Sequence, residues 1–83
     1  MEIRMDLQID KVNKLCAICD ACNFDVNVIS GRICVDGKSV MGVMKMCGRT
    51  VTISPVTLND DDAEDFFNKI KPLGAYKTEG FYG

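Results

Sequence analysis

The sequence predicts one α+β domain, in which a four-stranded antiparallel sheet carries three helices on one face. Residues 2–9 alternate apolar and polar side chains, so the first strand has only one face to bury. Three later segments carry apolar side chains at helical spacing. The elements follow in the order β-α-β-β-α-β-α, and one-faced strands with amphipathic helices pack most simply as an antiparallel sheet covered on one side.

The first strand and helix are predicted from "EIRMDLQIDKVNKLCAICDAC". The apolar side chains of the strand are Ile3, Met5, Leu7 and Ile9. Asp10 offers a side-chain oxygen as N-cap for a helix over about residues 11–22. Within that helix, apolar positions 12, 15, 16, 19 and 22 follow the i, i+3, i+4, i+7 spacing of one buried face.

Two short strands and a short helix follow. The strands are "DVNVIS" and "RICVD", rich in Val and Ile and joined tightly around Ser30–Gly31. Ser39 is suited to cap the helix. Its spaced apolar residues are Val40, Val43, Met44 and Met46. Gly48 can take the left-handed conformation that ends a helix.

The C-terminal third predicts a fourth strand and a third helix. "TVTISP" alternates and is ended by Pro55. "TLNDDDAEDFFNKIKPLG" begins at Thr57 or Asn59, with acids in its first turn and lysines in its last, as the helix dipole favours. The run Asn59–Asp62 lacks the glycine and distal glutamate of a calcium loop, so we interpret it as a helix start. The core spans about residues 1–72, and residues 73–83 form a tail without periodicity.

The length and composition of the chain exclude several classes of function. A chain of 83 residues has a small core. The net charge of -2 argues against direct nucleic-acid binding, and no apolar run approaches the roughly 18–20 residues that cross a membrane. The N-terminus does not resemble a signal peptide, so we expect a cytoplasmic protein. The absence of histidine excludes imidazole acid–base chemistry, phosphohistidine chemistry and histidine-ligated metals.

Three cysteines at intervals of three, Cys16, Cys19 and Cys22, raise the question of a metal or redox site. Iron–sulfur ligands of this spacing lie in a loop, with a fourth cysteine and a following proline. Here the intervening residues favour a helix, no Cys-Pro pair occurs, and buried cysteine packs as a small apolar residue. We therefore expect core packing, with no metal and no cofactor. A redox or metal-binding protein that also uses Cys34 or Cys47 stays the alternative.

The stretch "GKSVMGVM", Gly37 to Met44, resembles the regulatory segment of the HPr family. These are the small phosphocarriers of the bacterial sugar phosphotransferase system, in which a serine opens a short helix with a Met- and Gly-rich turn. The resemblance covers the chain to about Pro72, and the order β-α-β-β-α-β-α is the HPr order. It implies the HPr-like open-faced sandwich fold.

The sequence departs from the HPr family at the phosphorylation site. HPr carries its phosphoryl group on a histidine at the start of the first helix. The position of that histidine falls at about Asp10, that of the nearby arginine at about Val12 and that of the proline at about Asn13. The resemblance therefore implies a divergent, non-catalytic member that cannot relay phosphate on histidine. An aspartyl phosphate at Asp10 is the alternative to an N-cap there.

The resemblance also implies a regulatory role. In Gram-positive HPr proteins, a dedicated kinase phosphorylates the helix-opening serine, and the product binds a transcriptional regulator in carbon catabolite control. Ser39 occupies that position. We expect a protein-binding module with Ser39 as phosphorylation candidate. The expected contact residues are Val40, Met41, Met44 and Met46. The alternatives are that Ser39 only caps the helix, or that the domain has an unrelated protein-binding role.

Overall fold

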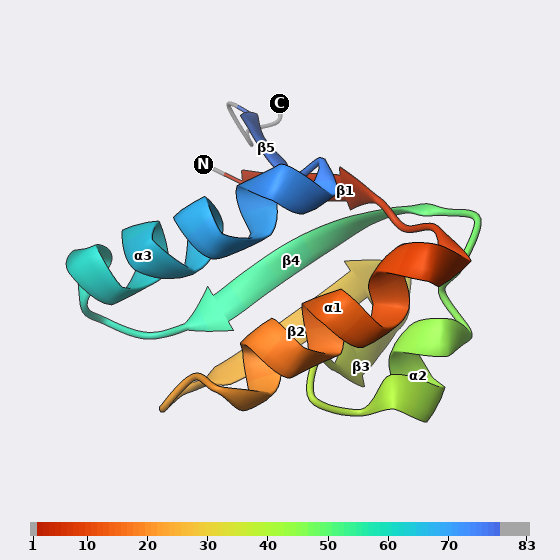
Figure 1. Ribbon diagram of the computed structural model, residues 1–83, viewed down its shortest axis with the longest axis horizontal. Helices are drawn as coiled ribbons and strands as arrows, with labels where there is room; N and C mark the ends of the chain where they lie inside the picture. The colour runs from red at the N-terminus through yellow and green to blue at the C-terminus, as the bar shows by residue number, and fades with distance from the viewer. Residues whose placement is uncertain (1, 79–83) are drawn as a thin grey trace.

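The chain folds into an antiparallel sheet covered by helices, in a computed structural model that describes residues 2–78 (Figure 1). The elements in chain order are β1 (Glu2–Asp6), α1 (Ile9–Asp20), β2 (Asp25–Ser30), β3 (Ile33–Asp36), α2 (Val40–Met44), β4 (Thr50–Val56), α3 (Asp60–Ile70), the 3-10 turn η1 (Lys71–Leu73) and β5 (Tyr76–Thr78). The first seven elements follow the predicted order. The α+β class and the three helices are confirmed for the described residues.

The sheet has the strand order β3-β2-β4-β1-β5, and each neighbouring pair is antiparallel. Ile53 of β4 lies opposite Ile3 of β1 and Val28 of β2, so these three side chains share one face. That face is buried, and α1 and α3 lie across it (Figure 1). The side chains that alternate with the buried ones along the strands, such as Arg4 and Thr52, lie on the other face and are exposed or half-buried. The one-sided burial predicted from the alternation is confirmed.

The prediction of four strands was wrong, because part of the expected tail pairs with β1. Lys77 of β5 lies opposite Ile3, and Thr78 lies opposite Glu2. Three residues are too few to show a periodicity, so tertiary contacts decide whether such a segment becomes a strand. Residues 79–83 of the predicted tail lie outside the described residues.

Side-chain contacts join β5 to α3. The ammonium of Lys77 lies 2.6 Å from a carboxylate oxygen of Glu64 and 4.7 Å from the ring centroid of Phe67. Ala75, just before the strand, is buried. Gly74 turns the chain from η1 into this strand with a φ of 101°, in the left-handed region where a Cβ atom is unfavourable.

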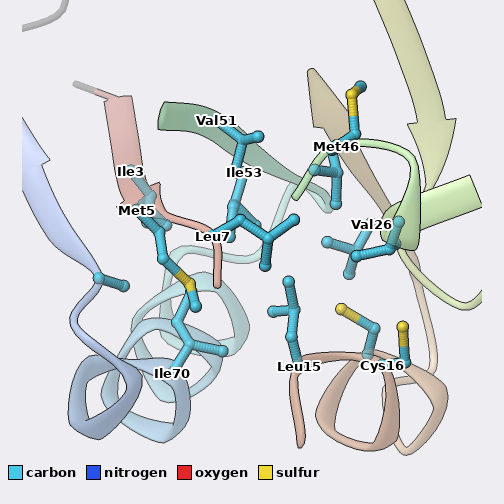
Figure 2. Close-up of a cluster of buried hydrophobic side chains, with 14 of the residues drawn as sticks. Ile3, Met5, Leu7, Leu15, Cys16, Val26, Met46, Val51, Ile53 and Ile70 are labelled. Carbon is cyan, nitrogen blue, oxygen red and sulfur yellow. The ribbon is translucent and has the colours of Figure 1, made fainter. Parts of the chain in front are cut away.

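The core lies between the sheet and the helices, and Figure 2 shows part of it. Met5 of β1 reaches toward Ile70 of α3, and Leu15 of α1 points toward Leu7 (Figure 2). One turn before Ile70, the ring of Phe66 packs edge-on against Phe24, with the ring centroids 6.2 Å apart. The core therefore joins the sheet to α1 and α3, which cover one of its faces.

The first strand is shorter than predicted, and the first helix begins earlier. β1 ends at Asp6, and Ile9 is 64% exposed in the first turn of α1 instead of lying on the buried strand face. Gln8 is the N-cap residue, without a side-chain capping bond, so the prediction that Asp10 caps this helix was wrong. The backbone N–H of Lys11 already donates to the carbonyl of Gln8, at 2.9 Å, which places Asp10 inside the first turn.

Pro55 does not end the fourth strand, which continues to Val56. Pro55 lies opposite Val26, whose carbonyl accepts a hydrogen bond from Gly37 on the other side of β2, at 2.7 Å. In an antiparallel strand, the N–H and C=O groups of one residue point to the same side. Those of Val26 point away from β4, so Val26 and Pro55 form a pair that has no hydrogen bond between them. The proline therefore removes nothing from the β2–β4 ladder.

The predicted cap of the third helix and two predicted turn glycines agree with the structure, whereas α1 ends at Asp20, two residues before the predicted Cys22. Asn59 caps α3 by accepting hydrogen bonds from the N–H groups of Asp61 and Asp62. Gly31 in the β2–β3 turn and Gly48 after α2 both have positive φ, of 59° and 85°. Within residues 2–78, the helices are too short and too polar for any of them to cross a membrane.

Replacing Gly74 by alanine should lower the free energy of unfolding by about 1–2 kcal/mol, because a Cβ atom is strained in the left-handed region. The added Cβ would also lie 3.4 Å from the ammonium nitrogen of Lys11. Urea denaturation measures the change. Gly74→Asn is the matched control, since asparagine tolerates this conformation better and should lose less. Equal stability of wild type and both variants would contradict the assignment of this turn.

Candidate functional site

A tight turn after β3 places Ser39 at the start of α2. The N–H groups of Lys38 and Ser39 donate to the side chain and the carbonyl of Asp36, both at 2.9 Å. Ser39 then accepts a hydrogen bond on its Oγ from the N–H of Gly42, at 3.3 Å. Its side chain is exposed to solvent. The predicted capping role of Ser39 is therefore confirmed, and its hydroxyl group is accessible.

Gly42 allows α2 to lie close to the sheet. A Cβ atom on this residue would lie 3.2 Å from the Cβ of Val35 in β3 and 3.3 Å from the Oγ of Ser39. A larger residue would have to push the helix away from β3 or disturb the cap. The sequence pattern gives helical spacing but not this distance, so the requirement for glycine here is visible only in the structure.

Three apolar side chains of α2 are exposed, and we call them the α2 patch: Val40 (39% exposed), Met41 (78%) and Met44 (46%). The other two apolar side chains of this region, Val43 and Met46, are buried in the core. The expectation that Met46 belongs to a binding surface was therefore wrong. Val43 and Met46 are three residues apart, so they share the face of the turn that points inward.

The charges around the α2 patch are positive. Residues 37–49 contain Lys38, Lys45 and Arg49 and no acidic residue, in a chain whose net charge is -2, and the nearest acid in the sequence is Asp36, whose carboxylate accepts the N–H of Lys38. The ammonium of Lys38 donates to the carbonyl of Cys22, at 3.3 Å, which anchors the start of the α2 segment to the end of α1. Lys45 and Arg49 are exposed. An apolar surface with a basic rim therefore lies on an acidic protein.

Asp10, which the resemblance to HPr would place at the phosphohistidine, lies exposed in the first turn of α1. Within residues 2–78 its carboxylate forms no ion pair. Val12, which the resemblance would place at the HPr arginine, is 1% exposed and belongs to the core. The structure thus brings no basic side chain of α1 to the position that the HPr arginine would take.

The three cysteines of α1 pack in or against the core. Cys16 and Cys19 are buried, as expected, and Cys22 is half-buried with its Sγ 3.3 Å from the carbonyl of Ile18. Burial raises the pKa of all three thiols, for Cys19 to about 12 with a further contribution from the neighbouring Cys16 and Cys22. The thiolate is the form that binds metals and attacks disulfides, so these groups are poor ligands and poor nucleophiles near neutral pH.

Cys34 does not join the cysteines of α1. It lies exposed on β3 opposite Ile29, on the sheet face that the helices leave open, whereas Cys16 and Cys19 face the covered side. Among residues 2–78, no three acidic or thiol side chains are grouped as metal ligands. The described part of the chain therefore offers no cluster of ligands for the metal alternative, and the redox alternative stays untested.

A hollow of about 560 Å³ lies far from α2, where β1 begins and β4 ends. Its lining includes Ile53, Pro55, Ala63, Phe67 and Lys77. Glu64 on its rim is paired with Lys77. No local sequence pattern indicates this hollow, because it is formed by the packing of α3 and β5 over strand ends that are distant in the chain.

Truncation of a buried and of an exposed methionine should change the stability by very different amounts. Met46→Ala should lower the free energy of unfolding by about 2–5 kcal/mol, because it leaves a cavity in the core. Met41→Ala should change it by less than about 0.5 kcal/mol, because this side chain is exposed. Chemical denaturation of both variants checks the burial of the two side chains. A similar loss for both would contradict it.

The stability of the protein should fall as the pH rises above about 9 through the raised pKa of Cys19. The thiol has its usual pKa of 9.0 in the unfolded chain and about 12 in the folded protein, so between these values the folded state holds a proton that the unfolded state has lost. Its contribution is complete below pH 9 and disappears toward pH 12. The free energy of unfolding of wild type and Cys19→Ala, measured across this range, isolates the effect. A parallel decline in both proteins would show that Cys19 does not contribute.

The site was compared with known proteins through the whole sequence. No model of a known protein family matches the chain, and no curated protein matches it. The relation to the HPr family therefore stays a prediction from the residues quoted above.

Proposed function

We propose that this protein is a divergent, non-catalytic HPr-like module that binds other proteins through the α2 patch and is regulated by phosphorylation of Ser39. The observation that supports it best is the position of an exposed capping serine directly before an exposed pair of methionines. Both features lie on one short helix and are therefore available to the same partner.

The exposed apolar side chains favour protein binding. A helix of five residues buries Val43 and leaves Val40, Met41 and Met44 in contact with solvent. Methionine side chains are flexible and polarisable, so they adapt to partner surfaces of different shape. An apolar patch of this kind on a small protein is typical of a contact surface.

The sheet and helix order support the assignment to an HPr-like fold. The described chain has the order expected for that fold up to α3, and β5 is an addition at the edge of the sheet. A phosphoryl relay on histidine has no acceptor here, because the chain contains no histidine. In this proposal, the protein keeps the regulatory role of HPr and lacks the transfer of phosphoryl groups.

A phosphate at Ser39 would change the charge of the α2 surface. It adds about -1.5 to -2 charges at pH 7, which offsets most of the positive charge of residues 37–49. Its oxygens can accept the hydrogen bond that Gly42 now donates to Ser39. The backbone of α2 can stay in place, while a partner that reads charge next to the methionines is selected or rejected.

The partners that this proposal implies are a serine kinase of the HPr type and a transcriptional regulator, in the cytoplasm of a bacterium. The unmodified α2 surface, apolar with a basic rim, fits a partner with acidic groups around an apolar contact. The phosphorylated surface fits one that presents Arg or Lys near an apolar groove.

Incubation with an HPr-type serine kinase and ATP should add one phosphoryl group to the wild-type protein, measured by intact mass. Ser39→Ala should stay unmodified, and it should lower the free energy of unfolding by about 0.5–2 kcal/mol through loss of the cap. Ser54→Ala is the matched control, because Ser54 is half-buried in β4 and should not affect the reaction.

Two outcomes would contradict the proposed switch. If wild type and Ser39→Ala are both unmodified, Ser39 is only a cap. If both are modified, another residue accepts the phosphate. A second variant tests the binding surface independently of phosphorylation. Met41→Ser should weaken the binding of a partner protein to the α2 patch without altering the fold.

A further inference from the structure

The end of the molecule opposite α2 carries a second exposed apolar group, surrounded by acids. Leu58, in the connection from β4 to α3, is fully exposed, and Val56, the last residue of β4, is 53% exposed. Residues 56–68 contain five carboxylates and no cation. They are Asp60, Asp61, Asp62, Glu64 and Asp65, all exposed, and of these Glu64 is already paired with Lys77. We call Val56, Leu58 and these acids the acidic end.

The α2 patch and the acidic end lie at opposite ends of the long axis of the molecule, which is horizontal in Figure 1. The start of α3 lies at the left of that view and α2 at the right. The basic rim of the α2 patch and the acidic end therefore cannot meet within one molecule. They can meet between two.

We propose that the α2 patch of one copy of this chain docks on the acidic end of a second copy, head to tail. The apolar side chains Met41 and Met44 then face Leu58, and Lys45 and Arg49 face the carboxylates of the first turn of α3. Each surface combines exposed apolar side chains with exposed charged residues close to them in the sequence, and the charges of the two surfaces are opposite in sign, as in complementary protein surfaces.

In a head-to-tail pair, one α2 patch and one acidic end stay unoccupied. Because the two surfaces lie at opposite ends of the long axis, further copies can add at both ends, and the products are chains of increasing length. The surfaces are small, so the association is weak and reversible. Opposite charges at the rims make it sensitive to salt.

This self-association goes beyond the proposed regulation and does not depend on phosphorylation of Ser39. A partner protein on the α2 patch would compete with the second copy for the same surface. The kinase experiment above and the association experiment below can therefore fail independently.

The test is sedimentation equilibrium of the full chain from about 10 μM to about 1 mM, at low and high salt. The apparent mass should rise with concentration at low salt and stay monomeric at high salt. Lys45→Glu and Asp61→Lys, each alone, should weaken association about tenfold, by placing like charges opposite each other. Lys71→Glu is the matched control, an exposed lysine of η1 outside both surfaces, and should associate like wild type.

Mixing the two variants separates a head-to-tail contact from other forms of self-association. The Lys45→Glu protein keeps its acidic end and the Asp61→Lys protein keeps its basic rim, so the mixture should recover association that neither has alone. Leu58→Ser should weaken association without changing stability, because the side chain is fully exposed in the monomer.

The proposal is overturned if the wild-type chain stays monomeric at low salt over the whole concentration range. It is also overturned if Lys45→Glu affects association and Asp61→Lys does not, because that result means that α2 meets α2. Circular dichroism of each variant confirms folding, and a variant that unfolds is replaced by Arg49→Glu or Asp62→Lys at the same surface.

Discussion

The buried face of the sheet fixes every other part of this molecule. Alternate side chains of β1, β2 and β4 form a single apolar layer, and each helix is placed by what it inserts into that layer. α1 contributes Leu15, α3 contributes Phe66 and Ile70, and α2 contributes Val43. Because Val43 and Met46 are taken by the core, the remaining side chains of α2 have no inner surface to contact. The exposed patch is thus a consequence of how the core is filled.

Much of this arrangement follows from local patterns in the sequence. The alternation in residues 2–7, the caps at Ser39 and Asn59 and the glycine at position 48 each have a local physical cause, and the structure agrees with them. Features that depend on distant contacts were not predictable in this way. β5 exists because Lys77 reaches Glu64 and Phe67, and Pro55 is tolerated because the carbonyl of Val26 points to the other side.

The candidate site shows the same division. Ser39 and the apolar character of α2 were visible in the sequence, because a capping serine before a Met-rich turn is a local pattern. The assignment of Met46 to the surface failed because helical spacing alone does not tell which face of a short helix is buried. The need for Gly42 comes from a contact with Val35, seven residues earlier and in a different element.

The position of β1 has a consequence for how the chain folds. β1 lies between β4 and β5, so both of its partners are distant in sequence, with Ile3 paired to Ile53 on one side and to Lys77 on the other. The β2–β3 hairpin can close early because its strands are adjacent, whereas β1 must wait for β4, which ends at Val56. During synthesis on a ribosome, the first strand to emerge therefore stays without partners until the fourth is complete. The apolar side chains of β1 are exposed during that interval. The nascent chain is therefore most open to chaperones and to aggregation before β4 has been made.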